Sequence, residues 1–110
     1  MPLINQYTFQ TAAVATGAGT VMPCEGIAIV LVEITGITTA TVTFQATGAS
    51  GTYASVQAKP LATGTLATTA TADGLYRVVL NGALGFRCNI TSWTSGTITI
   101  TGAPSNNPAF

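Results

Sequence analysis

Alternation of threonine with apolar residues is the main pattern in this sequence. In 39–43 and 97–101 a threonine stands at every second position, with Ala, Val or Ile between. A period of two places hydroxyls on one face of an extended chain and hydrocarbon on the other. Threonine is β-branched and suits such a pleated surface. The pattern predicts half-buried β-strands, and no segment shows a convincing helical period.

Several segments fit a strand and are separated by turn signals at short intervals. The strongest covers 27–34, which is apolar on both faces and is therefore predicted to be a central strand covered on two sides. Three others alternate clearly: 40–46 with Val42 and Phe44 inward, 75–80 with Tyr76, Val78 and Leu80 inward, and 86–93 with Phe86, Cys88 and Ile90 inward. Shorter candidates lie at 3–10, 20–24, 52–58, 65–70 and 97–101.

Glycine-containing turns divide these candidates. Gly36 and the segment 94–96 are predicted to turn the chain, and Asn81-Gly82 predicts a hairpin that joins 75–80 to 86–93. The spacing indicates an all-β fold: a single antiparallel β-sandwich, jelly-roll-like, with about eight short strands. We expect one domain over residues 1–102, in which 1–10 could serve as an N-terminal arm, followed by an irregular C-terminal arm over 103–110.

Charge is scarce in this chain. Only 5% of its 110 residues are charged, three basic and three acidic, and there is no histidine. Three scattered cations cannot form the basic surface that nucleic acid or an anionic membrane requires, so neither is expected as a partner. The start of the chain lacks the pattern of a signal peptide, and the longest apolar run, 27–32, is too short to span a bilayer. We therefore expect synthesis in a cytoplasm.

Catalytic and metal-binding constellations are not apparent. A two-carboxylate site from Glu25 and Glu33 would need an aromatic-lined cleft, for which the chain offers a single tryptophan. Asp73 precedes Gly74 and is expected to bond its own backbone in a turn. The oxygen ligands for calcium are scattered, and no base is placed to activate a serine or threonine. We expect no enzyme activity, no catalytic residue, no cofactor and no metal.

Two cysteines, Cys24 and Cys88, lie far apart in the sequence. Without an export signal, buried free thiols are the simpler interpretation, and a disulfide closing this long loop is the alternative.

Six residues are candidate partner contacts. Arg77 and Arg87 flank Asn81-Gly82, so a regular hairpin would place them nearly opposite each other. They could pair with the chain's own carboxylates or with those of a neighbouring subunit. Trp93 is either part of the core or an exposed anchor. The remaining candidates lie near the termini, which could be reaching arms or simply frayed ends: Leu3, Ile4 and Phe110.

A block of motifs over 48–102 resembles small β-sandwich structural proteins of tailed bacteriophage virions. The motifs are Ser50-Gly51-Thr52-Tyr53, Thr63-Gly64-Thr65-Leu66-Ala67-Thr68, Asp73-Gly74-Leu75-Tyr76-Arg77-Val78, Phe86-Arg87-Cys88 and Trp93-Thr94-Ser95-Gly96-Thr97-Ile98-Thr99-Ile100-Thr101-Gly102. The resemblance implies a head decoration or cement protein on the outer capsid surface of the virion. Its implied partners are the major capsid protein and neighbouring copies of itself, as a homo-oligomer on the lattice.

Other functions stay open at this stage. Related phage sandwiches also occur in tails, baseplates and fibres, where copy number would be lower. A carbohydrate-binding module would need Tyr53, Tyr76 and Trp93 exposed in a row. An ice-binding surface would need a flat, regular array of threonines.

Overall fold

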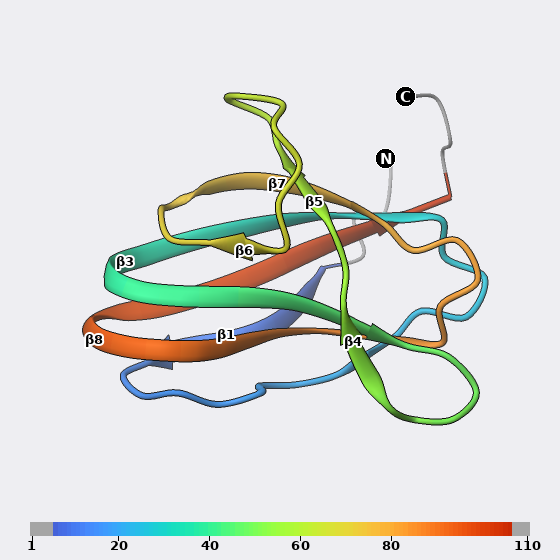
Figure 1. Cartoon of the computed structure of the whole chain (residues 1–110), viewed down its shortest axis with the longest axis horizontal. Coiled ribbons are helices and arrows are strands. Elements are labelled where there is room, and N and C mark those ends of the chain that lie inside the picture. The colour runs from blue at the N-terminus through green and yellow to red at the C-terminus, as the bar shows by residue number, and fades with distance from the viewer. Residues whose placement is uncertain (1–5, 107–110) are drawn as a thin grey trace.

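The computed structural model describes residues 6–106 and contains only strands as regular elements in that range (Figure 1). Because no helix is present there, nothing in that range offers a helix that could cross a membrane. The eight strands pair antiparallel in one sheet, which confirms the all-β class. Their bounds are β1 Tyr7–Ala13, β2 Met22–Pro23, β3 Ile29–Thr47, β4 Tyr53–Ser55, β5 Ala58–Pro60, β6 Thr69–Ala70, β7 Gly74–Val79 and β8 Gly85–Ser105.

Two strands, β3 and β8, are much longer than the predicted segments. They pair along their whole lengths, from Ile29 opposite Ser105 to Thr47 opposite Gly85. Both bend near the middle, so that their ladder folds back on itself and forms two layers (Figure 1). We call one layer the β7 half: residues 29–35 of β3 and 97–105 of β8, with β1, β5 and β7. The other, the β4 half, contains 40–47 of β3 and 85–93 of β8, with β2, β4 and β6.

Glycines allow this bend. Gly36 and Gly96 have φ angles of 89° and 118°, in a region that L side chains rarely adopt. A Cβ on Gly36 would overlap the carbonyl oxygen of Thr97 on the other strand. The prediction that Gly36 and the segment 94–96 turn the chain between separate strands was wrong. Each long strand continues through the bend, with register shifts between Thr35 and Val42.

The side chain of Asp73 stabilises the bend. Its carboxylate oxygens accept hydrogen bonds from the backbone N–H groups of Gly36, at 3.0 Å, and Ile37, at 2.8 Å. The prediction that Asp73 bonds its own turn was therefore wrong. A carboxylate can satisfy two N–H groups that the irregular ladder leaves without strand partners, and such charge-assisted bonds are strong.

The core lies between the two layers and confirms the predicted alternation. Most of the inward residues come from the even-numbered positions of β3, β7 and β8, and Phe9 on β1 and Met22 on β2 also contribute to the core. All of those predicted to point inward are buried: Val42, Phe44, Tyr76, Val78, Leu80, Phe86, Cys88 and Ile90. Cys24 and Cys88 are both buried and free, so the thiol interpretation is confirmed.

The predicted hairpin at Asn81-Gly82 was wrong. Strand β7 pairs with β3 and β5, whereas β8 pairs with β1, β2 and β3, so the two strands that flank this turn are not partners. Leu80 and Leu84 instead bond to the backbone of Ala28 and Thr47, at opposite ends of β3. The local turn chemistry was recognised, but long-range pairing with β3 decides where each strand goes.

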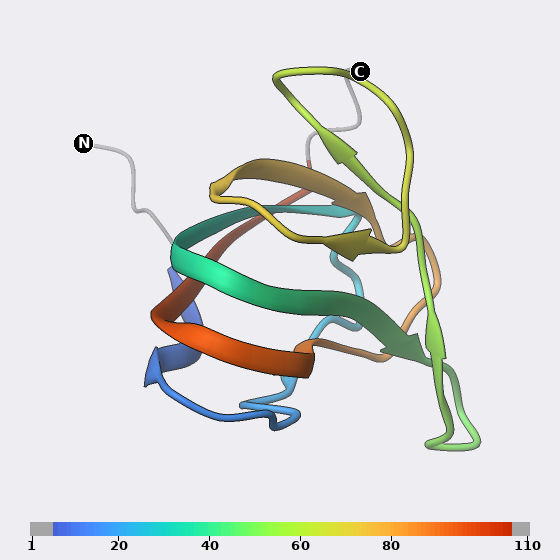
Figure 2. The same cartoon turned by 60° about the vertical axis from the view of Figure 1, so that its left-hand side comes forward.

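Short strands cross the open side of the two layers. Strand β4 pairs with β3 in the β4 half, and β5 pairs with β7 in the β7 half. Figure 2 shows the β4–β5 segment running from one layer to the other. Strand β8 continues to Ser105, three residues into the predicted C-terminal arm.

Candidate functional site

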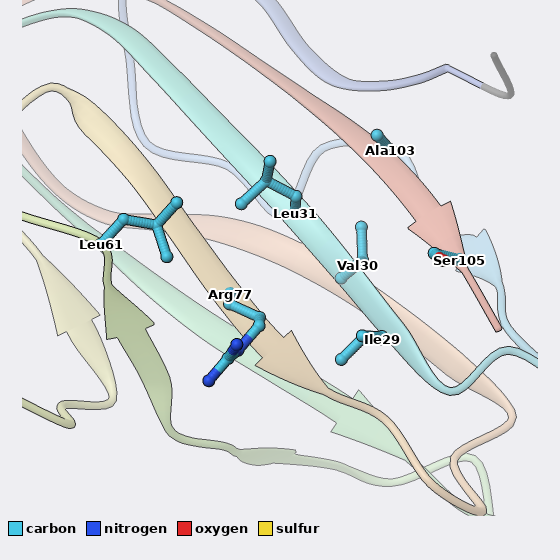
Figure 3. A pocket seen from close by; sticks show the side chains of 7 residues that line it. All are labelled: Ile29, Val30, Leu31, Leu61, Arg77, Ala103 and Ser105. Atoms are coloured by element: carbon cyan, nitrogen blue, oxygen red, sulfur yellow. The ribbon is translucent and has the colours of Figure 1, made fainter. Parts of the chain in front are cut away.

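Two adjoining hollows lie on the outer surface of the β7 half. The first, about 140 Å³, is drawn in Figure 3, and the second is about 260 Å³; both contain Leu31 and Ala103 in their walls. We call the pair the groove. The first hollow is lined by Ile29, Val30, Leu31, Leu61, Arg77, Ala103 and Ser105, and the second adds Gln6, Glu33, Leu75, Thr101 and Gly102.

Strand register explains why these residues meet. Leu31 on β3 lies between Ala103 on β8 and Arg77 on β7, and Arg77 in turn lies beside Lys59 on β5. Two residues further along β3, Glu33 lies between Thr101 on β8 and Leu75 on β7. These are the odd-numbered positions of strands whose even-numbered positions form the core, so they point away from it.

Exposed hydrocarbon marks this surface. Leu61 is 51% exposed, Leu75 42% and Val79 59%. Figure 3 shows Leu61 reaching over β7 toward Leu31, with Arg77 beside them. Isolated exposed apolar residues are ordinary, but a group of them around a hollow is typical of a contact surface.

Two of the six formal charges of the chain, Arg77 and Glu33, line the mainly apolar groove, and a third, Lys59, lies beside it. Lys59 and Arg77 are neighbours across β5 and β7, and Glu33 lies one pair away on β3. Neither Lys59 nor Glu33 forms an ion pair within residues 6–106. Together, Lys59, Arg77 and Glu33 give the groove and its edge a net charge of +1.

The groove explains why the segment 27–34 is apolar on both faces. The segment 27–34 is apolar on both faces, which predicted cover on both sides. Its place between β8 and β7 is central, as expected, but the outward side chain of Leu31 faces the open groove. The apolar second face of this central strand therefore lines an open hollow, and Leu61 and Leu75 were not predicted from the sequence to be part of it.

The outer surface of the β4 half is polar and internally bonded. Arg87 on β8 donates from Nε to Oε1 of Gln45 on β3, at 2.8 Å, and its guanidinium lies 3.9 Å from the ring centre of Tyr53. Asn89 donates to the same Gln45 oxygen at 3.3 Å. Beyond them, the hydroxyls of Thr43 and Thr91 are 2.9 Å apart.

The predicted site residues are thus separated. Arg77 lies on the groove and Arg87 on the other half, so the expectation that they oppose each other across a hairpin was wrong. Trp93 packs partly buried against the core, and its Nε1–H donates to the carbonyl oxygen of Gly96 at 3.0 Å. Leu3, Ile4 and Phe110 lie outside the described residues.

The aromatic residues do not form a binding row. Tyr76 is buried, with its hydroxyl donating to the carbonyl oxygen of Ala72 at 2.6 Å, and Tyr53 lies against Arg87. Trp93 is half-buried in the bend. A flat platform for a sugar ring is therefore not built from these three side chains.

Titratable side chains are also dispersed within residues 6–106. No group of three or more Cys, Asp or Glu residues gathers there in a way that could hold a metal ion. Burial raises the pKa of the Cys88 thiol, which keeps it protonated and unreactive at neutral pH. The groove can bind by apolar burial and a few polar contacts, and it presents no nucleophile with an activating base.

Comparisons with known proteins fit this fold. The model of the XepA family matches residues 4–104. The SPBc2 prophage-derived protein YomS has a similar structure, with a TM-score of 0.84, 20% sequence identity and 94% of each chain covered. The PBSX exported protein XepA superposes with a TM-score of 0.88 and 22% identity over 93% of this chain. This chain spans 37% of the length of that protein. A search of curated proteins finds no match.

These matches relate the chain to phage proteins, as the resemblance in its sequence implied, and they leave head decoration untested. The family match extends over nearly all of the described residues, including every strand of both halves except the end of β8. The chain belongs to the XepA family.

Proposed function

We propose that this chain is a non-enzymatic phage structural protein that decorates the outer surface of a capsid, where its groove seats a segment of the major capsid protein. The observation that carries the proposal is the groove itself: an open, mainly apolar hollow on a sheet whose other face forms the core. A surface backed by a core holds its shape, so little entropy is lost when a partner docks.

The groove indicates what kind of segment it would accept. The first hollow suits one apolar side chain between Leu31 and Leu61, and Lys59 lies close by without an ion pair in the described chain. A partner segment with an apolar residue next to a carboxylate would bury the apolar residue in the hollow, and the carboxylate would pair with Lys59. Most of the binding would come from apolar burial, so it would depend weakly on salt.

The relatives support a phage setting. YomS is named as a prophage-derived protein and XepA as a PBSX exported protein. Work on a particle surface requires contacts and rigidity rather than chemistry, which agrees with the dispersed titratable groups in residues 6–106.

The direct test is to purify particles of the phage that encodes this chain and measure its copy number by quantitative mass spectrometry. Hundreds of copies per particle are expected of a capsid decoration protein. A few to tens of copies would favour the tail, baseplate or fibre instead, and absence from the particle would overturn a virion role.

The groove is tested by binding of the purified chain to particles that lack it. We expect Leu61→Ser to weaken retention on particles strongly. Leu66→Ser is a matched control, because Leu66 is equally exposed, at 54%, and is not among the residues that line the groove. Equal retention of the two variants would show that the groove is not the contact surface.

A second candidate function is favoured by one observation. The PBSX protein with the similar fold is named as exported, so this chain could instead work outside the host cell as a contact module of released phage products. Induced cultures separate the two functions: the decoration protein sediments with particles, whereas an exported module stays in the particle-free medium.

A further inference from the structure

Arg87 is held in place on the outer surface of the β4 half, on the opposite side of the core from the groove. Its guanidinium lies against the ring of Tyr53, with 3.9 Å from Cζ to the ring centre, and its Nε–H is fixed by Gln45. Gln45 is itself fixed by the Asn89 amide, at 3.3 Å. An arginine that is stacked and bonded in this way has lost most of its rotamer freedom before any partner arrives.

The fixed guanidinium keeps most of its donors. A guanidinium has five N–H groups, and Gln45 takes only the one on Nε. Within residues 6–106, neither terminal nitrogen has a hydrogen-bond partner, and Arg87 forms no ion pair. The terminal N–H groups are therefore available for a planar acceptor on the edge away from Gln45.

The surroundings of Arg87 favour a single negative charge. Its strand neighbours on β3 and β8 are uncharged, and the other two cations, Lys59 and Arg77, lie on the β7 half. A phosphate dianion is usually held by several donors or cations together, whereas one guanidinium matches one carboxylate in a bidentate pair.

We propose that Arg87 is a docking point for a carboxylate of a protein partner, with Tyr53 and Gln45 as positioning residues. The proposal deepens the proposed function, because it gives the protein a second contact on the half opposite the groove. A molecule with contacts on both halves can join two neighbouring partner surfaces, which a single groove cannot do.

The chain offers a favourable test, since Arg77 and Arg87 are its two arginines. In the purified chain labelled with ¹⁵N, each arginine gives one Nε–H signal, and Arg77→Lys identifies which is which. Titration with acetate at constant ionic strength should shift the Arg87 signal along a saturation curve. The Arg77 signal, in the same sample, serves as the reference and should move less.

Two further measurements separate docking from general attraction of anions. Tyr53→Ala should weaken acetate binding at Arg87 roughly two- to fivefold, which is the share expected of one stacked cation–π contact. Inorganic phosphate at the same ionic strength should shift the Arg87 signal less than acetate does. Circular dichroism of Tyr53→Ala shows whether the variant is folded, and the comparison of the two arginines in the unaltered chain does not depend on any Tyr53 variant.

Three outcomes would overturn the proposal: equal responses of the two arginines, a stronger response to phosphate than to acetate, or unchanged binding in folded Tyr53→Ala. The titration uses the isolated chain. Its result therefore stands apart from whether the chain is found on particles, and failure of one proposal can be distinguished from failure of the other.

Discussion

The two halves of the folded sheet share one core but have different outer surfaces. On the β7 half, Leu61 and Leu75 are exposed in the walls of the groove, and Val79, the strand neighbour of Ile29, is exposed as well. On the β4 half, outward polar side chains bond one another, as Arg87 and Gln45 do. A surface of mutually bonded polar groups is satisfied in water, whereas exposed hydrocarbon gains when it is covered. This difference supports the proposals of an apolar docking surface on the β7 half and of a directional polar contact on the β4 half.

The largest expected effect comes from breaking the bend that joins the halves. We expect Gly36→Ala to lower the free energy of unfolding by roughly 3 kcal/mol, because the residue has a φ of 89° and its new Cβ would overlap the Thr97 carbonyl oxygen. Urea denaturation measures the loss. Gly48→Ala is the control, since nothing lies within 4 Å of its Cβ position, and it should change stability by less than about 0.5 kcal/mol. Equal losses in both variants would contradict this account of the bend.

Alkaline pH should destabilise the fold, because each half contains a buried titratable side chain whose pKa is raised. Burial raises the pKa of the Cys88 thiol, inward on the β4 half, above its ordinary 9.0. Burial, and then the Asp73 carboxylate, raises the pKa of Tyr76, inward on the β7 half, above its ordinary 10.0. The unfolded chain therefore loses these protons at lower pH than the folded chain, and stability falls as pH rises above about 9.

The measurement is the urea midpoint between about pH 8 and about pH 11. Tyrosinate absorbance and thiol reactivity followed in the same samples should report a single transition, because both halves share one core. A midpoint that stays constant over this range would contradict the prediction. Two separate transitions would show that the halves unfold independently.

Removing the Asp73 carboxylate should lower the free energy of unfolding less than adding a Cβ at Gly36 does. Asp73→Asn keeps the shape of the side chain but loses one acceptor and the charge that hold Gly36 and Ile37, and should cost about 1–2 kcal/mol. Glu33→Gln is the matched control. The Glu33 side chain is exposed and makes no hydrogen bond or ion pair with residues 6–106, so the thermal midpoint of Glu33→Gln should equal that of the unaltered chain. If the Asp73→Asn and Glu33→Gln variants have the same thermal midpoint, the Asp73 carboxylate does not stabilise the bend.

The smallest expected changes in stability come from substitutions of outward-pointing side chains, one on each half. Thr43→Val in the β4 half leaves the Thr91 hydroxyl without its 2.9 Å partner and should cost about 1 kcal/mol. Leu61→Thr in the β7 half removes exposed hydrocarbon and should change stability by less than about 0.5 kcal/mol. Chemical denaturation of the two variants side by side is sufficient. A larger loss for Leu61→Thr would show that the groove stabilises the fold rather than serving a partner.

Much of the fold could be predicted from the sequence, because alternation is a local property. Val42 and Phe44 were assigned to the core on their spacing, and both are buried. The continuation of β3 and β8 through Gly36 and Gly96 could not be predicted in the same way. A bulge and a turn make the same local demand for positive φ, and only the long-range pairing of the two strands distinguishes them.

The candidate site was harder to predict than the fold. Arg77 and Arg87 were singled out for their type, and the structure places one on each half. The groove depends on Leu61 from the segment after β5 meeting Leu31 on β3, a contact between residues far apart in sequence. Asp73 was assigned to its own turn because Asp-Gly is a common turn pair, while its real partners lie near residue 36.

The shared ladder of β3 and β8 also bears on how the chain is made. It pairs Ile29 with Ser105 and Thr47 with Gly85, so β3 is synthesised long before the strand that covers its edge. Until the ribosome has delivered residues 85–105, the apolar positions of β3 have no permanent neighbour along that edge. Folding should therefore be slow and should finish late, and the nascent chain should depend on chaperones during that interval.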